Sequence, residues 1–252
     1  GMRAKFSGFH NITEVLFEPS YSHALVTTVL LTGWIVCITT VLGLLIALVL
    51  HHVQKGRLFY KLLLLWPYAV APAIAAVLWR FLFHPTLGWL SEWCTWLNGS
   101  FNYLMHPKLA LAVVVIVSVW QQLSYNILFF FVSLESIPAS ILEAAWLEGA
   151  SSWQCFWKIR LPMLRATLLF LVLMNALYAF FETFSVIDIL TSGGPGDRTT
   201  TLLYKIYKDG FIGMDWSSAA VQSLLLMLMV VGITLLKFRY DKHQILLEEA
   251  SS

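Results

Sequence analysis

Charged residues are scarce in this chain of 252 residues. Only 12% of its residues are Asp, Glu, Lys or Arg, whereas 59% are hydrophobic; a soluble globular domain carries about 25% charged residues. The formal net charge of +2 comes with no basic stripe, so the composition gives no reason to expect a nucleic-acid partner. The composition therefore indicates that membrane lipid surrounds most of the chain.

The sequence also lacks the motifs of several enzyme classes. It has no Gly-x-x-x-x-Gly-Lys-[Ser/Thr] loop for ATP, no Gly-x-Ser-x-Gly elbow and no His-Glu-x-x-His zinc motif. Its three cysteines, Cys37, Cys94 and Cys155, have no spacing typical of a disulfide or a metal site. We therefore expect no catalytic residue, no metal ion and no cofactor bound by this chain.

Five apolar runs are long enough to cross a bilayer, which takes about 20 helical residues: 24–50, 59–83, 108–134, 166–190 and 219–238. The pattern predicts an all-α polytopic membrane protein, a single domain over residues 1–252 with a membrane core at 24–238. The connectors 51–61 and 135–165 and the tail from residue 237 hold Lys and Arg and share one side, whereas the connector 84–107 holds neither. The positive-inside rule assigns the basic side to the cytoplasm.

Prolines and polar residues interrupt three of the runs. Pro67 and Pro72 predict a kinked or broken second helix, which either lines a substrate path or is a structural kink. Polar groups inside the third and fourth runs indicate a wet pathway or contacts between helices. For Glu182, an ion pair with Arg80 is an equally open alternative. The predicted pathway residues are Pro67, Tyr68, Pro72, Gln122, Tyr125, Asn126, Asn175, Tyr178 and Glu182.

Two connectors on the outer side have a recognisable character. Residues 84–107 are rich in Trp, which is typical of a segment lying at the membrane interface. Residues 202–211 have helical spacing and predict a short surface helix that ends at Gly210. On that helix we favour a solvated face for Lys205 and Lys208 over a role in attracting an anionic solute.

The stretch 136–162 lies between the third and fourth runs and predicts two short helices on the cytoplasmic side. Ser136 and the pair Ser151-Ser152 are helix-start signals, and Gly149 between them predicts a tight turn. Alternating polar and apolar residues suit a helix pair that lies across the membrane surface and docks another protein.

The stretch holds Glu143-Ala144-Ala145, followed by Gly149-Ala150 and by Leu161-Pro162. In this spacing it resembles the EAA loop of ABC-importer permease subunits in the maltose-permease-like, binding-protein-dependent family. Glu148 departs from the pattern, which commonly has Asp there. The resemblance implies coupling helices that fit into a cleft of a separate ATPase subunit, with Glu143 as a polar contact and Gly149 as the turn. The coupling residues that it implies are Glu143, Ala144, Ala145, Glu148, Gly149, Ala150, Phe156, Leu161 and Pro162.

The stretches 65–79, 122–130 and 191–211 are similar, more narrowly, to the A-type permease subunits of sn-glycerol-3-phosphate importers. That similarity implies a multi-pass protein of the bacterial inner membrane, working as a heterodimer with a second permease, two ATPase subunits that use ATP and a periplasmic substrate-binding protein. The implied cargo is sn-glycerol-3-phosphate or a glycerophosphodiester. A sugar or oligosaccharide permease is the alternative, and a passive channel is a more distant one. The similarity also implies a protein of six helices, so either the chain is truncated before residue 1, which we favour, or it works with five.

Overall fold

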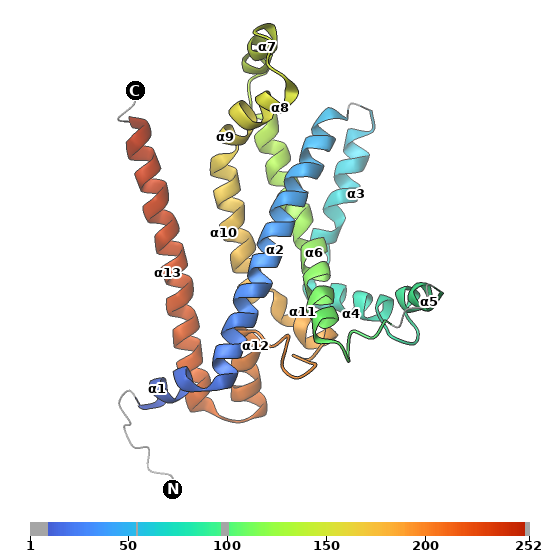
Figure 1. Cartoon of the computed structure of the whole chain (residues 1–252), viewed down its shortest axis with the longest axis vertical. Helices are drawn as coiled ribbons and strands as arrows, with labels where there is room; N and C mark the ends of the chain where they lie inside the picture. The colour runs from blue at the N-terminus through green and yellow to red at the C-terminus, as the bar shows by residue number, and fades with distance from the viewer. Residues whose placement is uncertain (1–9, 54, 97–100, 250–252) are drawn as a thin grey trace.

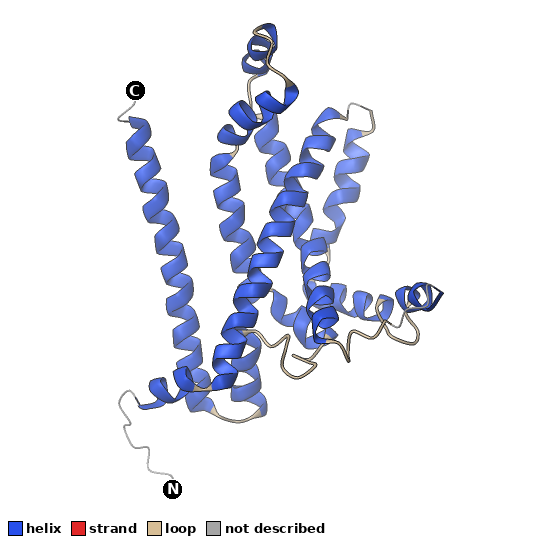
Figure 2. Cartoon of the chain, in the orientation of Figure 1, coloured by secondary structure: helices blue, strands red, loops and turns tan. Residues whose placement is uncertain are grey.

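A computed structural model of the chain describes residues 10–53, 55–96 and 101–249, and this part contains helices and loops without strands (Figure 2). Three helices are long and apolar enough to cross a membrane: α2 (Pro19–His52), α6 (Pro107–Glu135) and the Trp216–Leu235 part of α13 (Trp216–Glu249). Two bent pairs raise the number to as many as five: α3 (Arg57–Ala69) with α4 (Pro72–Leu82), and Ser152–Met163 with α10 (Arg165–Phe181). The predicted all-α membrane fold is confirmed.

The short helices gather at the two ends of the bundle (Figure 1). One end carries the projecting loop of α7 (Ala139–Leu147), α8 (Ser152–Cys155), the π-helical segment η1 (Phe156–Arg160) and α9 (Leu161–Met163). The other end, called the outer end below, carries α1 (His10–Phe17), α5 (Trp89–Trp96), α11 (Thr183–Leu190), α12 (Leu202–Tyr207) and the π-helical segment η2 (Lys208–Ile212).

Helix α2 packs closely on α6 because Gly43 leaves room for it. A Cβ atom on Gly43 would lie 2.7 Å from the Cβ atom of Asn126, closer than two carbon atoms can approach. Nearer the outer end, the fully buried Leu31 and Ile35 of α2 join a cluster that includes Val114 and Val117 of α6. The glycine at position 43 therefore allows close helix packing.

The second apolar run breaks where its prolines predict. Val70 and Ala71 are extended, with ψ angles of 126° and 139°, and α4 begins at Pro72, which has no N–H to donate. The two halves meet at an angle of 98°, so α4 turns aside at the outer end and does not continue the direction of α3. The run therefore forms a bent pair of helices.

At the outer end, the predictions for Gly210 and Lys205 are wrong. The helix does not end at Gly210 but continues as η2 to Ile212, and Gly210 is buried where an added Cβ would lie 3.0 Å from Ala219. The Lys205 side chain is only 7% exposed and pairs with Glu18 at 3.3 Å and with Asp209 at 2.8 Å. A buried cation needs such partners, so Lys205 ties α12 to the start of α2.

Lys208 differs from Lys205, because its side chain is 45% exposed. Its Nζ donates a hydrogen bond of 2.7 Å to the Asp197 carboxylate. This hydrogen bond is the main reason that the pKa of Asp197 lies below its ordinary value.

Candidate substrate cavity and coupling loop

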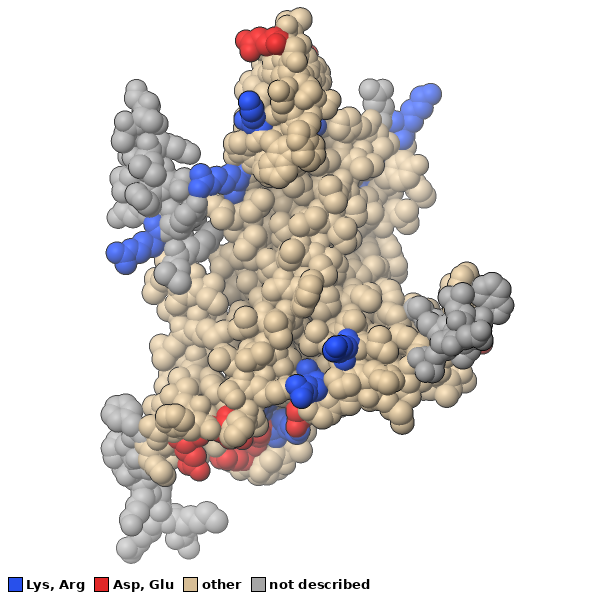
Figure 3. Space-filling view, in the orientation of Figure 1, with Lys and Arg blue, Asp and Glu red and all other residues tan. Residues whose placement is uncertain are grey.

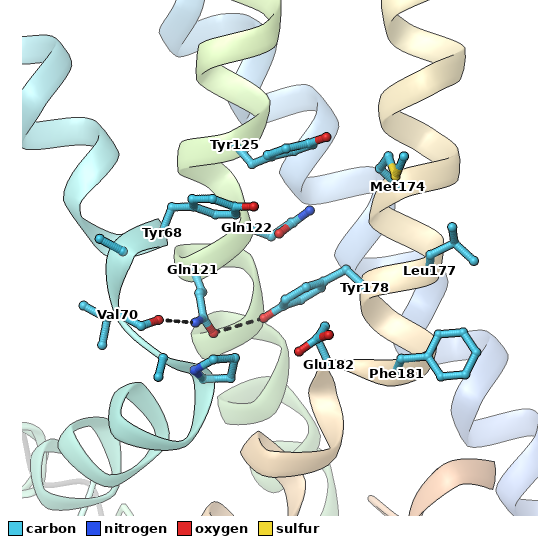
Figure 4. Close-up of a pocket in the computed structure, with 13 residues that line it drawn as sticks. Tyr68, Val70, Gln121, Gln122, Tyr125, Met174, Leu177, Tyr178, Phe181 and Glu182 are labelled. Carbon is cyan, nitrogen blue, oxygen red and sulfur yellow. Dashed lines mark hydrogen bonds between the residues drawn. The ribbon is translucent and has the colours of Figure 1, made fainter.

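A cavity of about 580 Å³ opens at the break between α3 and α4, and α6 and α10 form its other walls (Figure 4). The break exposes the backbone of Val70 and Ala71 to this cavity, where an unbroken helix would bury it in its own hydrogen bonds. The full lining consists of Tyr68, Ala69, Val70, Ala71, Pro72, Gln121, Gln122, Tyr125, Met174, Leu177, Tyr178, Phe181 and Glu182.

Gln121 connects the broken helix to α10 across the cavity (Figure 4). Its side-chain nitrogen donates a hydrogen bond of 2.8 Å to the carbonyl oxygen of Val70, which satisfies a backbone acceptor at the break. Its side-chain oxygen accepts a hydrogen bond of 3.2 Å from the Tyr178 hydroxyl. The amide thus fixes the position of the break relative to α10.

Six of the nine predicted pathway residues line this cavity: Tyr68, Pro72, Gln122, Tyr125, Tyr178 and Glu182. The rings of Tyr68 and Tyr125 stack with centroids 5.6 Å apart, joining α3 to α6 on one side of the cavity. Glu182 is exposed and falls between α10 and α11. Contact of any of these residues with a substrate stays a prediction.

The other three predicted pathway residues do not line the cavity. Pro67 is buried within α3, and Asn126 and Asn175 are each 0% exposed. The two asparagines hydrogen-bond each other, and Asn175 also bonds Gln122 and Thr40 of α2. In this structure the asparagines connect α2, α6 and α10, which is the helix–helix contact left open as the alternative for polar groups in these runs.

The proposed ion pair between Arg80 and Glu182 is absent, and the structure describes both residues. Arg80 instead donates a hydrogen bond of 3.1 Å to the carbonyl oxygen of Ile189 in α11. Glu182 is the only charged residue among those that line the cavity, all of which are described. The cavity therefore offers amide, phenol and carboxylate groups, which suit a ligand with hydroxyl groups.

Seven residues of the lining were not among the predicted pathway residues: Ala69, Val70 and Ala71 at the helix break, and Gln121, Met174, Leu177 and Phe181. Gln121 is next to Gln122 and has the same side chain. The sequence therefore offers no reason to choose it separately as a pathway residue. Met174, Leu177 and Phe181 carry no signal at all, since an apolar side chain that faces a cavity and one that faces lipid read alike.

The projecting loop contains the predicted pair of helices with a tight turn between them. Gly149 has a φ of +83°, the left-handed conformation that glycine adopts without strain. The amide nitrogen of Ala150 reaches back to the carbonyl oxygen of Ala145 at 2.9 Å, which closes the end of α7. Ser151 then starts the next helix through a reciprocal capping box with Gln154.

One start signal was misread. Ser136 ends α6 as its C-cap, and α7 begins at Ala139 after an extended Pro138. A serine between two helices can cap either of them in sequence. Ser136 belongs to α6, because its amide nitrogen bonds the carbonyl oxygen of Val132.

The loop has a buried base and an exposed tip. Leu142 and Cys155 are 9% and 2% exposed and belong to a cluster with Phe131 and Leu164 at the ends of α6 and α10. At the tip, Leu147 is 90% exposed and Trp153 is 69% exposed. Of the predicted coupling residues, Glu143, Ala144, Glu148, Gly149 and Pro162 are exposed, whereas Ala145, Ala150, Phe156 and Leu161 are half-buried.

The sequence pattern of the family described as "Binding-protein-dependent transport system inner membrane component" matches residues 39–242, which include the whole cavity lining and the loop. The chain belongs to this family. It is therefore a permease-type membrane component of a transport system, and its family places it in an inner membrane.

Curated relatives in this family share 40–42% identity with the chain. The "sn-glycerol-3-phosphate transport system permease protein UgpA" of Yersinia pestis is 42% identical over 97% of this chain and 83% of its own length. The proteins of that name from Pectobacterium atrosepticum and from Escherichia coli strain UTI89 are 40% and 41% identical over the same shares.

Two solved structures have the same fold. The chain matches a crystal structure of "a bacterial ABC transporter involved in the import of the acidic polysaccharide alginate" with a TM-score of 0.86, 19% identity, and coverage of 96% of this chain and 85% of that one. A second structure, of a bacterial alginate ABC transporter "in complex with alginate pentasaccharide-bound periplasmic protein", matches with a TM-score of 0.82, 20% identity, and coverage of 91% and 81%.

Proposed function

We propose that the chain is the permease subunit of an ATP-driven importer that carries sn-glycerol-3-phosphate or a glycerophosphodiester. The observation that carries the proposal is the identity of 40–42%, over 97% of this chain, to permease proteins named for sn-glycerol-3-phosphate transport. The cavity at the helix break supports it, because a cavity of about 580 Å³ has room for a small solute.

The cavity supplies half of the pathway in this proposal. Gln122, Tyr178 and Glu182 accept or donate hydrogen bonds to the hydroxyl groups of the glycerol moiety. Since Glu182 is the only charged residue among the described residues of the lining, the phosphate faces away from it, toward cations of a second permease subunit. The pathway is therefore completed by a heterodimer, with one cavity wall from each subunit.

The projecting loop couples the permease to ATP hydrolysis in this proposal. Two ATPase subunits, one for each permease, hold the coupling helices, and this chain binds no ATP itself. An exposed tip on a base packed against α6 and α10 suits a rigid lever, because movement of the tip is passed directly to two walls of the cavity. A periplasmic binding protein delivers the cargo to the outer end, in keeping with the family's description.

Reconstituted transport tests the proposal. The full complex in proteoliposomes, with binding protein outside and ATP on the ATPase side, should accumulate labelled sn-glycerol-3-phosphate and should stop when a hydrolysis-deficient ATPase is substituted. Uptake of an oligosaccharide in place of the phosphate ester would show the sugar-permease alternative, which the alginate importers of the same fold keep open. Flux that continues with the inactive ATPase would show a passive channel.

A further inference from the structure

A second hollow, of about 790 Å³, lies at the outer end between α2 and the start of α6, and we refer to it as the basic groove. We call its Lys, Arg and His residues the rim and its apolar residues, together with Thr27, the floor. The groove is lined by His23, Val26, Thr27, Leu30, His106, Pro107, Lys108, Leu109, Leu111 and Arg198. Figure 3 shows Lys and Arg atoms on this face of the molecule, near the outer ends of α2 and α6.

The cations of the rim are available to a ligand. Lys108 and Arg198 are both exposed, and neither side chain makes an ion pair within the described residues. The acid next to Arg198 in sequence, Asp197, is bound to Lys208 at 2.7 Å and also interacts electrostatically with His23, but it makes no ion pair with Arg198 or Lys108. Two uncompensated positive charges therefore stand at the mouth of an apolar groove.

The groove also lies at the level where the hydrocarbon region begins. His23 immediately precedes the apolar run of α2, and Lys108 begins the apolar run of α6. Further along α2, the side chains of Val26 and Leu30 are 56% and 52% exposed. Basic side chains at that boundary reach the headgroup layer, whereas exposed aliphatic side chains one turn further in meet acyl chains.

The basic groove and the cavity are on different sides of the bundle. No described residue of α2 lines the cavity, and α2 lies behind α6 and α10 in Figure 4 but in front of them in Figure 1. The buried bonds from Asn175 to Thr40 and Asn126 join the helices between the two hollows. The groove is therefore not part of the pathway described above.

From this arrangement we infer that the basic groove binds one anionic phospholipid of the outer leaflet. The lipid phosphate lies between Lys108 and Arg198, and an acyl chain lies along Val26, Leu30 and Leu111. A phospholipid fits both halves of the groove, since its charge matches the rim and its tail matches the floor. A soluble anion would leave the apolar floor in water, and a neutral lipid would leave the rim unpaired.

Lipid retention by the purified transporter complex tests this inference. The complex is equilibrated in mixed micelles with phosphatidylglycerol or phosphatidylcholine, and the bound lipid is counted by native mass spectrometry. Phosphatidylglycerol should bind more tightly to the unaltered complex, and Lys108→Gln or Arg198→Gln should each weaken its binding about fivefold. Lys108→Arg and Arg198→Lys should keep it, and Lys55→Gln, an equal loss of charge at the other end, should leave it unchanged.

Three results would overturn the inference. Equal retention of the two lipids, or the same loss in Lys55→Gln, would show that no specific site exists. Displacement of phosphatidylglycerol by inorganic phosphate at similar concentration would show a site for a soluble anion. A photo-crosslinker at position 108 that captures the second permease and no lipid would show that a protein covers the groove. Elution of each variant as intact complex on size exclusion separates these outcomes from misfolding.

Discussion

Asn126 on α6 and Asn175 on α10 form two reciprocal side-chain hydrogen bonds, one of 2.8 Å and one of 2.9 Å, with both residues fully buried. Asn175 extends the pair to Thr40 of α2 at 3.1 Å. Inside a bilayer no water can replace such bonds, so each amide depends on its partner. The pair thus holds three helices together next to the cavity, which opens at the break between α3 and α4.

Replacing one asparagine of this pair should destabilise the bundle. Asn175→Leu keeps the branched shape of the side chain but leaves the Asn126 side-chain oxygen without its donor, at a cost of about 1–3 kcal/mol. The double variant with Asn126→Leu should lose less than the sum of the two single losses, because it leaves no orphaned amide in the pair. Thermal unfolding of the reconstituted complex measures all three values, and strictly additive losses would show that the bonds contribute nothing.

The two glycines of α2 should respond differently to the same change. Gly43→Ala places a Cβ 2.7 Å from that of Asn126, so it should separate α2 from α6 at a cost of about 1–3 kcal/mol. Gly33→Ala meets nothing within 4 Å and should be neutral or slightly stabilising, because alanine favours helix. The same unfolding assay compares them, and equal effects would contradict the close approach at Gly43.

The sequence allows the helices to be predicted better than the surroundings of their polar groups. The break at Pro72 follows from a missing N–H and the constraint on Ala71, which are local properties. The angle of 98° between α3 and α4 does not follow from local properties, because it depends on the packing of α4 against α11, which lies over 100 residues later in the chain. The turn at Gly149 is local in the same way and was found.

Polar residues show the limit most clearly. Asn126 lies one helical turn from Gln122, and both look like pathway residues in sequence, yet one is fully buried and the other lines the cavity. Lys205 looked solvated because one of its partners, Glu18, lies 187 residues away in the chain. Tertiary packing decides which groups a polar side chain contacts, so these contacts cannot be predicted from the local spacing of residues in the sequence.

Changes at Gly149 should act on coupling more than on stability. At a φ of +83°, a β-branched residue is strained even though nothing crowds the position, so Gly149→Val should distort the turn. Gly149→Asn should be milder, since asparagine tolerates this conformation. We expect ATP-dependent uptake to fall in the order Gly, Asn, Val, while the amount of assembled permease heterodimer stays constant. Full transport in Gly149→Val would show that the turn geometry is not needed.

The exposed carboxylate of Glu143 should matter only if a partner holds the loop. Glu143→Ala is expected to weaken ATPase association or to separate hydrolysis from transport, and the ratio of ATP hydrolysed to solute accumulated measures this. Glu14→Ala, an exposed glutamate at the outer end, is the matched control and should leave that ratio unchanged. An unaltered ratio in both variants would remove Glu143 from the coupling contact.

In the proposed orientation of the cargo, Glu182 should bind the glycerol end. A hydroxyl bonded to the carboxylate gains about 1.5–3 kcal/mol. A bare phosphate about 8 Å from it would lose roughly 2 kcal/mol per charge at an effective dielectric constant near 20, so the proposed orientation requires that cations of the second permease neutralise the phosphate. If the glycerol end lies at Glu182, Glu182→Gln weakens the bond and lowers the uptake rate at limiting sn-glycerol-3-phosphate about tenfold. The same substitution should have little effect on competing n-propyl phosphate, which has no free hydroxyl on its carbon chain. Faster uptake of both esters by Glu182→Gln would instead place the phosphate beside the carboxylate and reverse the proposed orientation.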